Sequence, residues 1–407
     1  MVNADDAPSR VLIIVQNLPV PFDRRVWLEC RTLLQSGVEV AVVSPKAPGD
    51  PTFELREGVE LYKYAPRAAT GGAAGYAVEY LWSFAATLAL ALRAARRGRF
   101  DVVQACNPPD IFWPIALLLR RLHGTAFVFD HHDLCPELFD SRFPGGPPAV
   151  RKALVWLERR TLRSADQVCS TNDSYRSVAL VRGRIDPERV TVVRTGPDPQ
   201  RLTRRAPDPA LRRGRRYLAA YLGVMGPQDG VDLVLRVADV VVHRLGRRDV
   251  AFTLVGSGDC FAELCALRDE LDLAGDVELT GRLPDAEVAA VLSSADVGLS
   301  PDPKNPLNDV STMNKTMEYM AFELPVVAFD LRETRVSAGE AAVYATPNEV
   351  EDYARLLVEL LDDEPRRRRM GALGRRRVVE ELAWDYQAAR YLDVYRRLLD
   401  SRPLARV

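Results

Sequence analysis

The chain has 407 residues, which is longer than one typical hydrophobic core supports, so we expect two domains. Hydrophobic residues make up 47% and charged residues 27% of the chain, as in water-soluble globular proteins, and the formal net charge of −1 gives no global basis for binding nucleic acid. The six cysteines are scattered without a Cys-x-x-Cys pair, which argues against zinc and a disulfide framework and favours the reducing cytoplasm.

The first half of the chain opens on a short polar segment unlike a signal peptide, and apolar runs then alternate with amphipathic stretches. This alternation is typical of a parallel sheet covered by helices. The predicted strands are 11–16, 38–44, 59–64, 102–105, 126–130, 167–170 and 190–193. The predicted helices are 24–36, 76–97, 110–122, 148–163 and 173–183.

A linker rich in Pro and Arg, residues 196–216, interrupts this pattern before it resumes. The strands predicted after it are 217–222, 251–255, 277–280, 297–300 and 326–329. The helices predicted after it are 230–245, 261–272, 285–294, 313–323, 349–361 and 365–381.

The pattern therefore predicts two Rossmann-like, doubly wound α/β domains, residues 1–198 and 199–383, that face a cleft. Ligands of such folds bind outside the carboxyl ends of the strands, so we expect the site in that cleft. Residues 384–407 begin with an amphipathic helix rich in aromatic side chains. We expect this segment to pack on a domain and to cross back to the first one.

The segment 308–321 carries the most informative chemistry. Ser311 and Thr312 stand where a helix is predicted to begin, Lys315 follows in its first turn, and Glu318 lies one turn further on the same face. The start of a helix has unpaired N–H groups and a partial positive charge, so it suits a phosphate. Lys315 adds a full charge and Glu318 can accept hydrogen bonds from a sugar hydroxyl. This segment predicts a nucleotide-sugar site.

Five further segments stand at the ends of predicted strands: 16–27, 130–137, 223–232, 255–258 and 280–284. In this order and spacing, together with 308–321, they resemble the family-4 (GT4) glycosyltransferases, retaining enzymes with the GT-B fold. The resemblance covers essentially the whole chain. It implies an enzyme that moves a sugar from a nucleotide-diphosphate donor, UDP- or GDP-linked, to an acceptor hydroxyl. It also implies a bacterial acceptor that is a glycan, a lipid-linked molecule or a small molecule.

The resemblance places the nucleotide in the C-terminal domain and the acceptor in the N-terminal one. The candidate catalytic residues are His132, which would face the donor sugar, and Lys315. The candidate donor-binding residues are Gly226, Gln228, Gly256, Arg282, Leu283, Ser311, Thr312, Asn314, Lys315 and Glu318. The candidate acceptor-binding residues are Asp23, which would also cap the first helix, Arg25, Asp133 and Glu137. We expect no metal and no cofactor.

The sequence departs from the family pattern at three positions. Glu318 matches the second glutamate of the family's paired motif, but Val310 stands in place of the first. In the glycine-rich turn, Val224 and Asp229 stand where many relatives carry an Arg and a Lys that touch the diphosphate. Charge compensation therefore falls on Lys315, with Arg282, Arg335 or Arg25 as helpers.

Several alternatives stay open at this point. The departures allow a non-catalytic nucleotide-sugar-binding partner, and the fold allows a nucleotide-sugar epimerase. A metal site built from His131, His132, Asp133 and Glu137 matches no standard ligand spacing. The apolar stretch 76–95 and the basic amphipathic stretch 151–163 allow peripheral contact with the inner face of a membrane, although neither could span one.

Overall fold

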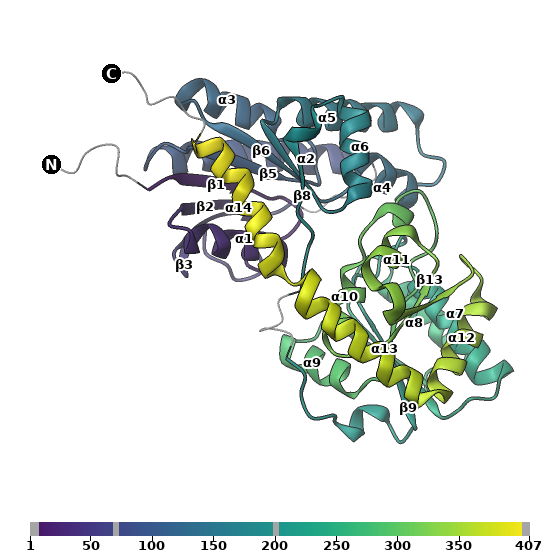
Figure 1. The fold of residues 1–407 in the computed structure, drawn as a ribbon. Helices are drawn as coiled ribbons and strands as arrows, with labels where there is room; N and C mark the ends of the chain where they lie inside the picture. Colours follow the sequence, from purple (N-terminus) through teal and green to yellow (C-terminus); the bar gives the residue numbers. More distant parts are fainter. Residues whose placement is uncertain (1–7, 68–72, 198–202, 401–407) are drawn as a thin grey trace. The chain divides into compact units, whose positions relative to one another are not determined.

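The computed structural model describes residues 8–67, 73–197 and 203–400 (Figure 1). They form two compact units. The first contains the described parts of residues 1–140, 145–195 and 385–407, and the second those of residues 141–144 and 196–384. Each unit is an α/β fold on a largely parallel sheet, which confirms the predicted fold class.

The first unit has, within the described residues, an eight-stranded sheet in the order β3-β4-β2-β1-β5-β6-β7-β8. Its pairings are parallel except that of β3 with β4. The strands are β1 (Arg10–Ile14), β2 (Glu39–Pro45), β3 (Phe53–Arg56), β4 (Val59–Tyr64), β5 (Val102–Cys106), β6 (Ala126–His131), β7 (Gln167–Ser170) and β8 (Val190–Val192). The helices are α1 (Arg24–Gln35), α2 (Ala73–Ala95), α3 (Trp113–His123), α4 (Cys135–Arg142), α5 (Pro148–Ser164), α6 (Asp173–Gly183), the short η2 (Pro187–Arg189) and α14 (Trp384–Asp400).

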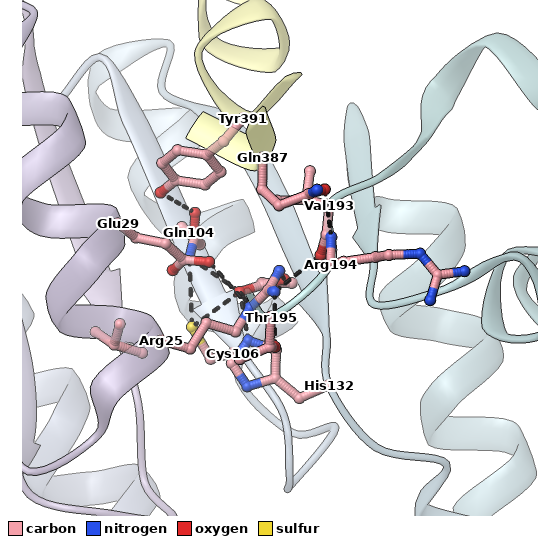
Figure 2. Close-up of polar contacts among 12 residues, drawn as sticks. Arg25, Glu29, Gln104, Cys106, His132, Val193, Arg194, Thr195, Gln387 and Tyr391 are labelled. Carbon is pink, nitrogen blue, oxygen red and sulfur yellow. Dashed lines mark hydrogen bonds and ion pairs between the residues drawn. The ribbon is translucent and has the colours of Figure 1, made fainter. Parts of the chain in front are cut away.

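The core of the first unit lies between one face of this sheet and four helices. Apolar side chains of β1, β2, β4, β5 and β6 pack there against α2, α3, α5 and α6. The opposite face meets α14, where the buried Tyr391 is hydrogen-bonded to Gln104 of β5 (Figure 2). Tyr395, also buried, hydrogen-bonds to the same residue. Because both faces of the sheet are covered, central strands such as β1 are nearly continuous apolar runs in the sequence.

The second unit has a six-stranded parallel sheet in the order β11-β10-β9-β12-β13-β14, counted over the described residues. The strands are β9 (Tyr217–Leu222), β10 (Val250–Val255), β11 (Val277–Gly281), β12 (Val297–Ser300), β13 (Val326–Phe329) and β14 (Ala342–Ala345). The helices are α7 (Val231–Asp239), α8 (Phe261–Glu270), α9 (Asp285–Ser294), α10 (Asn314–Ala321), α11 (Arg332–Ala338), α12 (Val350–Asp362) and α13 (Glu364–Arg377). Short helical turns are η3 (Pro209–Arg212), η4 (Val240–Arg244), η5 (Asn308–Val310), η6 (Gly339–Ala341) and η7 (Val378–Leu382).

Alternate residues of the second sheet point to two separate cores, as the pleat of a strand requires. Ala219 of β9 and Phe329 of β13 pack with α7 and α12, whereas Ala220 and Ala328 pack with α9 and α10.

Every predicted strand is present, and the predicted helices are found with ends shifted by a few residues. The helices predicted at 230–245 and 365–381 each change near their end to a wider, five-residue π-helical turn. Four elements were missed: β3, α4, α11 and β14. They are short, with four to eight residues each, so the periodicity in them is too weak to detect. Part of the predicted linker, 198–202, lies outside the described residues, as does the residue at which we placed the domain boundary.

Across the described ranges we find no helix with the length and apolarity needed to traverse a membrane.

Candidate active site

The turn after β9 is rich in glycine because other backbone passes close to it. Gly256, in the turn after β10, has a φ of 143°, and a Cβ there would collide with the carbonyl oxygen of Gly223. At Gly230, with a φ of 68°, a Cβ would collide with the carbonyl oxygen of Pro301, which follows β12. Because β9 lies between β10 and β12, the three turns meet at the carboxyl edge of the sheet. The predicted donor-binding glycines Gly226 and Gly256 both belong to these turns.

Lys315 is a buried cation at this edge. It is the second residue of α10 and only 8% exposed, and its Nζ lies 2.6 Å from Oδ1 of Asp302 and 5.1 Å from the ring centre of Tyr221. Burial alone would lower the pKa of Lys315, but the charges of Asp302 and Asp229 outweigh it and raise that pKa above its ordinary value. Lys315 is therefore charged, as predicted, but its ammonium already has a carboxylate partner.

A short hydrogen-bond chain fixes that partner. The hydroxyl of Ser300, the last residue of β12, donates to Oδ2 of Asp302 at 2.8 Å, and Thr316 Oγ1 donates to Ser300 Oγ at 3.3 Å. The Lys315–Asp302 pair is thus tied both to the end of β12 and to α10. We did not predict Asp302, although its position two residues after a predicted strand was a usable signal.

The helix predicted at 313–323 is found, but Met313 is its N-cap residue rather than Ser311 or Thr312. The chain first forms the turn η5, so α10 begins only at Asn314, and its N-cap, Met313, makes no side-chain hydrogen bond. Ser311 instead donates from Oγ to the carbonyl oxygen of Leu307 at 2.8 Å. Ser311 and Thr312 therefore precede the N-cap residue.

The other candidate donor residues are spread over neighbouring strand ends. Gln228 lies in the turn after β9, where its carbonyl oxygen accepts from Nδ2 of Asn308 at 2.9 Å. Arg282 and Leu283 follow β11, two strands away, with Arg282 exposed and Leu283 packed on the core. Glu318 is half-buried one turn after Lys315.

In the first unit, Arg25 and Asp130 form a buried ion pair at the carboxyl ends of the strands (Figure 2). Arg25 donates through Nη2 to Oδ1 of Asp130 at 2.8 Å and through Nε to Oδ2 at 3.2 Å. It also lies 3.1 Å from Glu29, and its Nη1 donates to the carbonyl oxygen of Val193 at 2.8 Å. Although burial alone would raise the pKa of Asp130, Arg25 and His132 outweigh it and hold that pKa well below its ordinary value.

His132 hydrogen-bonds through Nε2 to Oδ2 of this ionised Asp130. Because a carboxylate can only accept, Nε2 carries the proton and Nδ1 of a neutral ring is left as an acceptor. Asn107, at the end of β5, holds the backbone of the same loop: its Oδ1 accepts from the N–H groups of His132 at 2.6 Å and Asp133 at 3.0 Å. The loop and the ring are both fixed.

Cys106, Asp130 and His132 offer three ligand atoms within 4.8 Å of one another, the spacing of a metal site. The residues do not suit a divalent cation. Arg25 already supplies the positive charge at Asp130, and burial raises the pKa of the Cys106 thiol well above its ordinary value, which disfavours the thiolate that a metal needs. The four residues of the alternative metal site also have separate partners, since His131 faces Glu158 and Glu137 faces Arg182.

Comparison with known proteins decides the family. Residues 23–196 match the family model described as glycosyl transferase 4-like domain, and residues 216–363 match that of glycosyl transferases group 1. The chain is 32% identical over 306 residues to the D-inositol 3-phosphate glycosyltransferase of Thermomonospora curvata, an alignment that covers 70% of this chain and 69% of that protein. The chain belongs to the family-4 glycosyltransferases.

Solved structures give the same fold. Sucrose-phosphate synthase from Thermosynechococcus elongatus superimposes with a TM-score of 0.79 at 17% identity, covering 97% of this chain and all of that one. HepE from Anabaena, solved in complex with UDP-glucose, superimposes with a TM-score of 0.68 at 14% identity, covering 96% and 99% of the two chains. This family-4 glycosyltransferase therefore has the predicted GT-B architecture.

The acceptor-binding candidates of the glycosyltransferase differ in their surroundings. Asp23 caps α1, as predicted, by accepting from the N–H of Val26 at 3.1 Å. Asp133 lies in the loop that Asn107 holds. Glu137 makes a two-point ion pair with Arg182, at 2.6 and 3.1 Å.

The acceptor contact predicted for Arg25 is not supported. The guanidinium is 5% exposed, and its donors contact Asp130, Val193 and Thr195 inside the unit. Arg335, a predicted helper of Lys315, is likewise paired, with Asp330 at 2.8 Å.

Proposed function

We propose that this glycosyltransferase moves a sugar from a nucleotide-diphosphate donor to an acceptor hydroxyl with retention of the anomeric configuration. The observation that carries the proposal is Lys315, a buried lysine in the first turn of α10, beside the glycine-rich turn after β9. When the donor's glycosidic bond breaks, negative charge develops on the leaving diphosphate. A fixed cation and nearby backbone N–H groups stabilise that charge without reorganising.

The nucleotide binds, in this proposal, to the second unit. Backbone N–H groups of the turns after β9 and β10 and the ammonium of Lys315 hold the diphosphate, and Glu318 accepts from the ribose. The complex of HepE with UDP-glucose supports UDP as the nucleotide to test first. The relative from Thermomonospora curvata acts on an acceptor that carries a phosphate, which makes phosphorylated polyols suitable test acceptors.

A panel of UDP-, GDP-, TDP- and ADP-sugars tests this function. We expect one class of nucleotide sugar to be hydrolysed slowly without acceptor and consumed faster, by transfer, when an acceptor is present. Both reactions release free nucleoside diphosphate, and the glycoside formed by transfer should keep the donor's anomeric configuration. Release of an isomeric nucleotide sugar without free nucleotide would contradict transfer, and so would binding without turnover across acceptors.

We further propose that the enzyme contacts an anionic membrane at the cytoplasmic face. On α5, Lys152, Trp156, Arg159 and Arg160 are spaced so that they share one helix side, and all four are exposed. Trp156 is 54% exposed. An aromatic ring flanked by cations suits the interface of a bilayer with anionic headgroups.

All six cysteines are free thiols, which agrees with a reducing compartment.

Flotation with vesicles tests this contact. We expect the protein to float with phosphatidylcholine vesicles that contain phosphatidylglycerol and not with phosphatidylcholine alone. The double substitution Lys152→Glu and Arg159→Glu should reduce the bound fraction roughly tenfold or more. The matched control reverses two exposed arginines of α13, Arg368→Glu and Arg369→Glu. Equal flotation of both double variants would refute the assignment to α5.

A further inference from the structure

Asp229 places a carboxylate inside the glycine-rich turn of the proposed donor site. Its Oδ2 accepts from the backbone N–H of Gly226 at 2.9 Å and from Nε2 of Gln228 at 3.1 Å. Backbone N–H groups of such a turn are what a donor phosphate would use. An internal anion thus holds one of these donors before any ligand arrives.

The positive charge near Asp229 is largely neutralised by other groups. Lys315 is nearby, but its ammonium is paired with Asp302 at 2.6 Å. The two carboxylates and one ammonium together carry a net charge of −1 when Asp229 is ionised. The titratable and charged groups that face Asp229 are Lys315 of α10, Asp302 after β12, Tyr221 of β9, Arg142 at the end of α4 and Cys260 before α8.

The charge of Asp229 is not needed to build the turn. A neutral amide oxygen at the same position could accept from the same N–H of Gly226, as Asn and Asp both do in such local turns. Burial raises the pKa of Asp229 to about 6, against the pull of Lys315. Its carboxyl group therefore changes charge within the range in which the enzyme can be assayed.

We propose that Asp229 gates donor binding: its carboxylate competes with the diphosphate for the Gly226 N–H and for Lys315, and it takes up a proton when the donor binds. This inference rests on the proposed function, because it needs the diphosphate to bind at this turn. Asp229 is a residue that tunes affinity, and it acts on the donor by repulsion rather than by attraction.

The sign of the pH dependence follows from linkage. Below pH 6 the Asp229 carboxyl group is already neutral, so donor binding needs no further proton. Above pH 6, donor binding must either be coupled to protonation of Asp229 or leave the diphosphate facing a carboxylate. The Kd of the donor therefore rises with pH by up to about tenfold per pH unit. Lys315 stays charged throughout, since its pKa is raised.

Calorimetric titration of the whole enzyme with UDP-glucose and with GDP-mannose, from pH 5.5 to 8.5, tests the proposal. The diphosphate of these sugars has no proton to lose in this range. We expect Asp229→Asn to bind donor about tenfold or more tighter than wild type at pH 8 and equally well at pH 5.5. The matched control is Asp232→Asn, which removes the same charge from an exposed position three residues further along.

The outcomes separate this proposal from the proposed function. Binding of neither nucleotide sugar at any pH would count against the donor site itself. Donor binding whose pH dependence is the same in wild type and in Asp229→Asn would overturn the gate alone. An equal effect of Asp229→Asn and Asp232→Asn on the Kd of the donor would also overturn the gate. The comparison between variants also removes the contribution of Asp110, a buried carboxyl group of the first unit whose pKa burial raises to about 7.

Discussion

Two carboxylates, Asp130 and Asp302, lie buried at strand ends, and each faces a cation held by the same unit. Arg25 contacts Asp130 through two nitrogen atoms, and Lys315 contacts Asp302 through one. Removing either cation would leave a buried charge unpaired, at a cost of about 3–5 kcal/mol. Functional tests at these positions therefore need a design that separates a lost contact from a destabilised fold.

His132 allows such a test, because Asp130 keeps Arg25 as its partner when the imidazole is removed. If His132 hydrogen-bonds a hydroxyl of the donor sugar, His132→Ala should lower kcat by about ten- to a hundredfold with a small change in thermal stability. Initial rates and a thermal melt measure both. His243→Ala, at an exposed histidine of η4, is the control. Equal rates for the two variants would remove His132 from the reaction.

At the scale of elements, α14 is joined to the first sheet by a buried polar contact. Gln104 of β5 accepts at Oε1 from Tyr391 at 2.8 Å and from Tyr395, and its Nε2 donates to Glu29 at 2.7 Å (Figure 2). All these groups are buried. A buried amide needs its hydrogen-bond partners, so this contact fixes the position at which α14 packs on the sheet.

The double substitution Tyr391→Phe and Tyr395→Phe tests that docking. It leaves Oε1 of Gln104 buried without its two donors, so the free energy of unfolding of the first unit should fall by about 1–3 kcal/mol. Denaturant titration measures it. Tyr386→Phe, at a 48% exposed tyrosine of the same helix, should change the value by less than about 0.5 kcal/mol. A double variant as stable as this control would show that the contact contributes nothing.

The elements that were predicted from sequence and those that were missed differ in length and burial. Strands such as β10 are continuous apolar runs and stand out, whereas β3 is a four-residue edge strand of mixed character. The glycines of the turn after β9 and the position of Lys315 could likewise be predicted, since each follows a recognisable strand or begins a helix.

Pairings across the sheet could not be predicted. Lys315 meets Asp302 because α10 packs back on β12, the strand before it, and Gln104 meets Tyr391 because α14 covers β5. Neither way of helix packing is written in a local pattern. Gln104 did carry a signal, as a polar residue inside an apolar strand. The different N-cap residue has a local cause, because the turn η5 precedes the helix and Ser311 follows that turn directly.

At the scale of the whole molecule, each unit contains one preorganised candidate for the reaction. The first supplies a histidine whose tautomer a carboxylate fixes, and the second supplies a buried lysine beside glycine-rich turns. The molecule has almost no net charge, so attraction of an anionic donor depends on these local groups rather than on a global field. Lys315 is the central one, and the proposed function depends on it.

Titration of Lys315→Ala with UDP-glucose and GDP-mannose tests that claim most directly. A lost charge-assisted contact to the diphosphate should weaken donor binding by about ten- to a hundredfold. The double variant Lys315→Ala with Asp302→Asn should show the same loss without an unpaired buried carboxylate, and Lys304→Ala, at an exposed lysine, should bind as wild type. If Lys315→Ala and the double variant bind the donor as tightly as Lys304→Ala does, the diphosphate does not bind at Lys315 and the account is wrong.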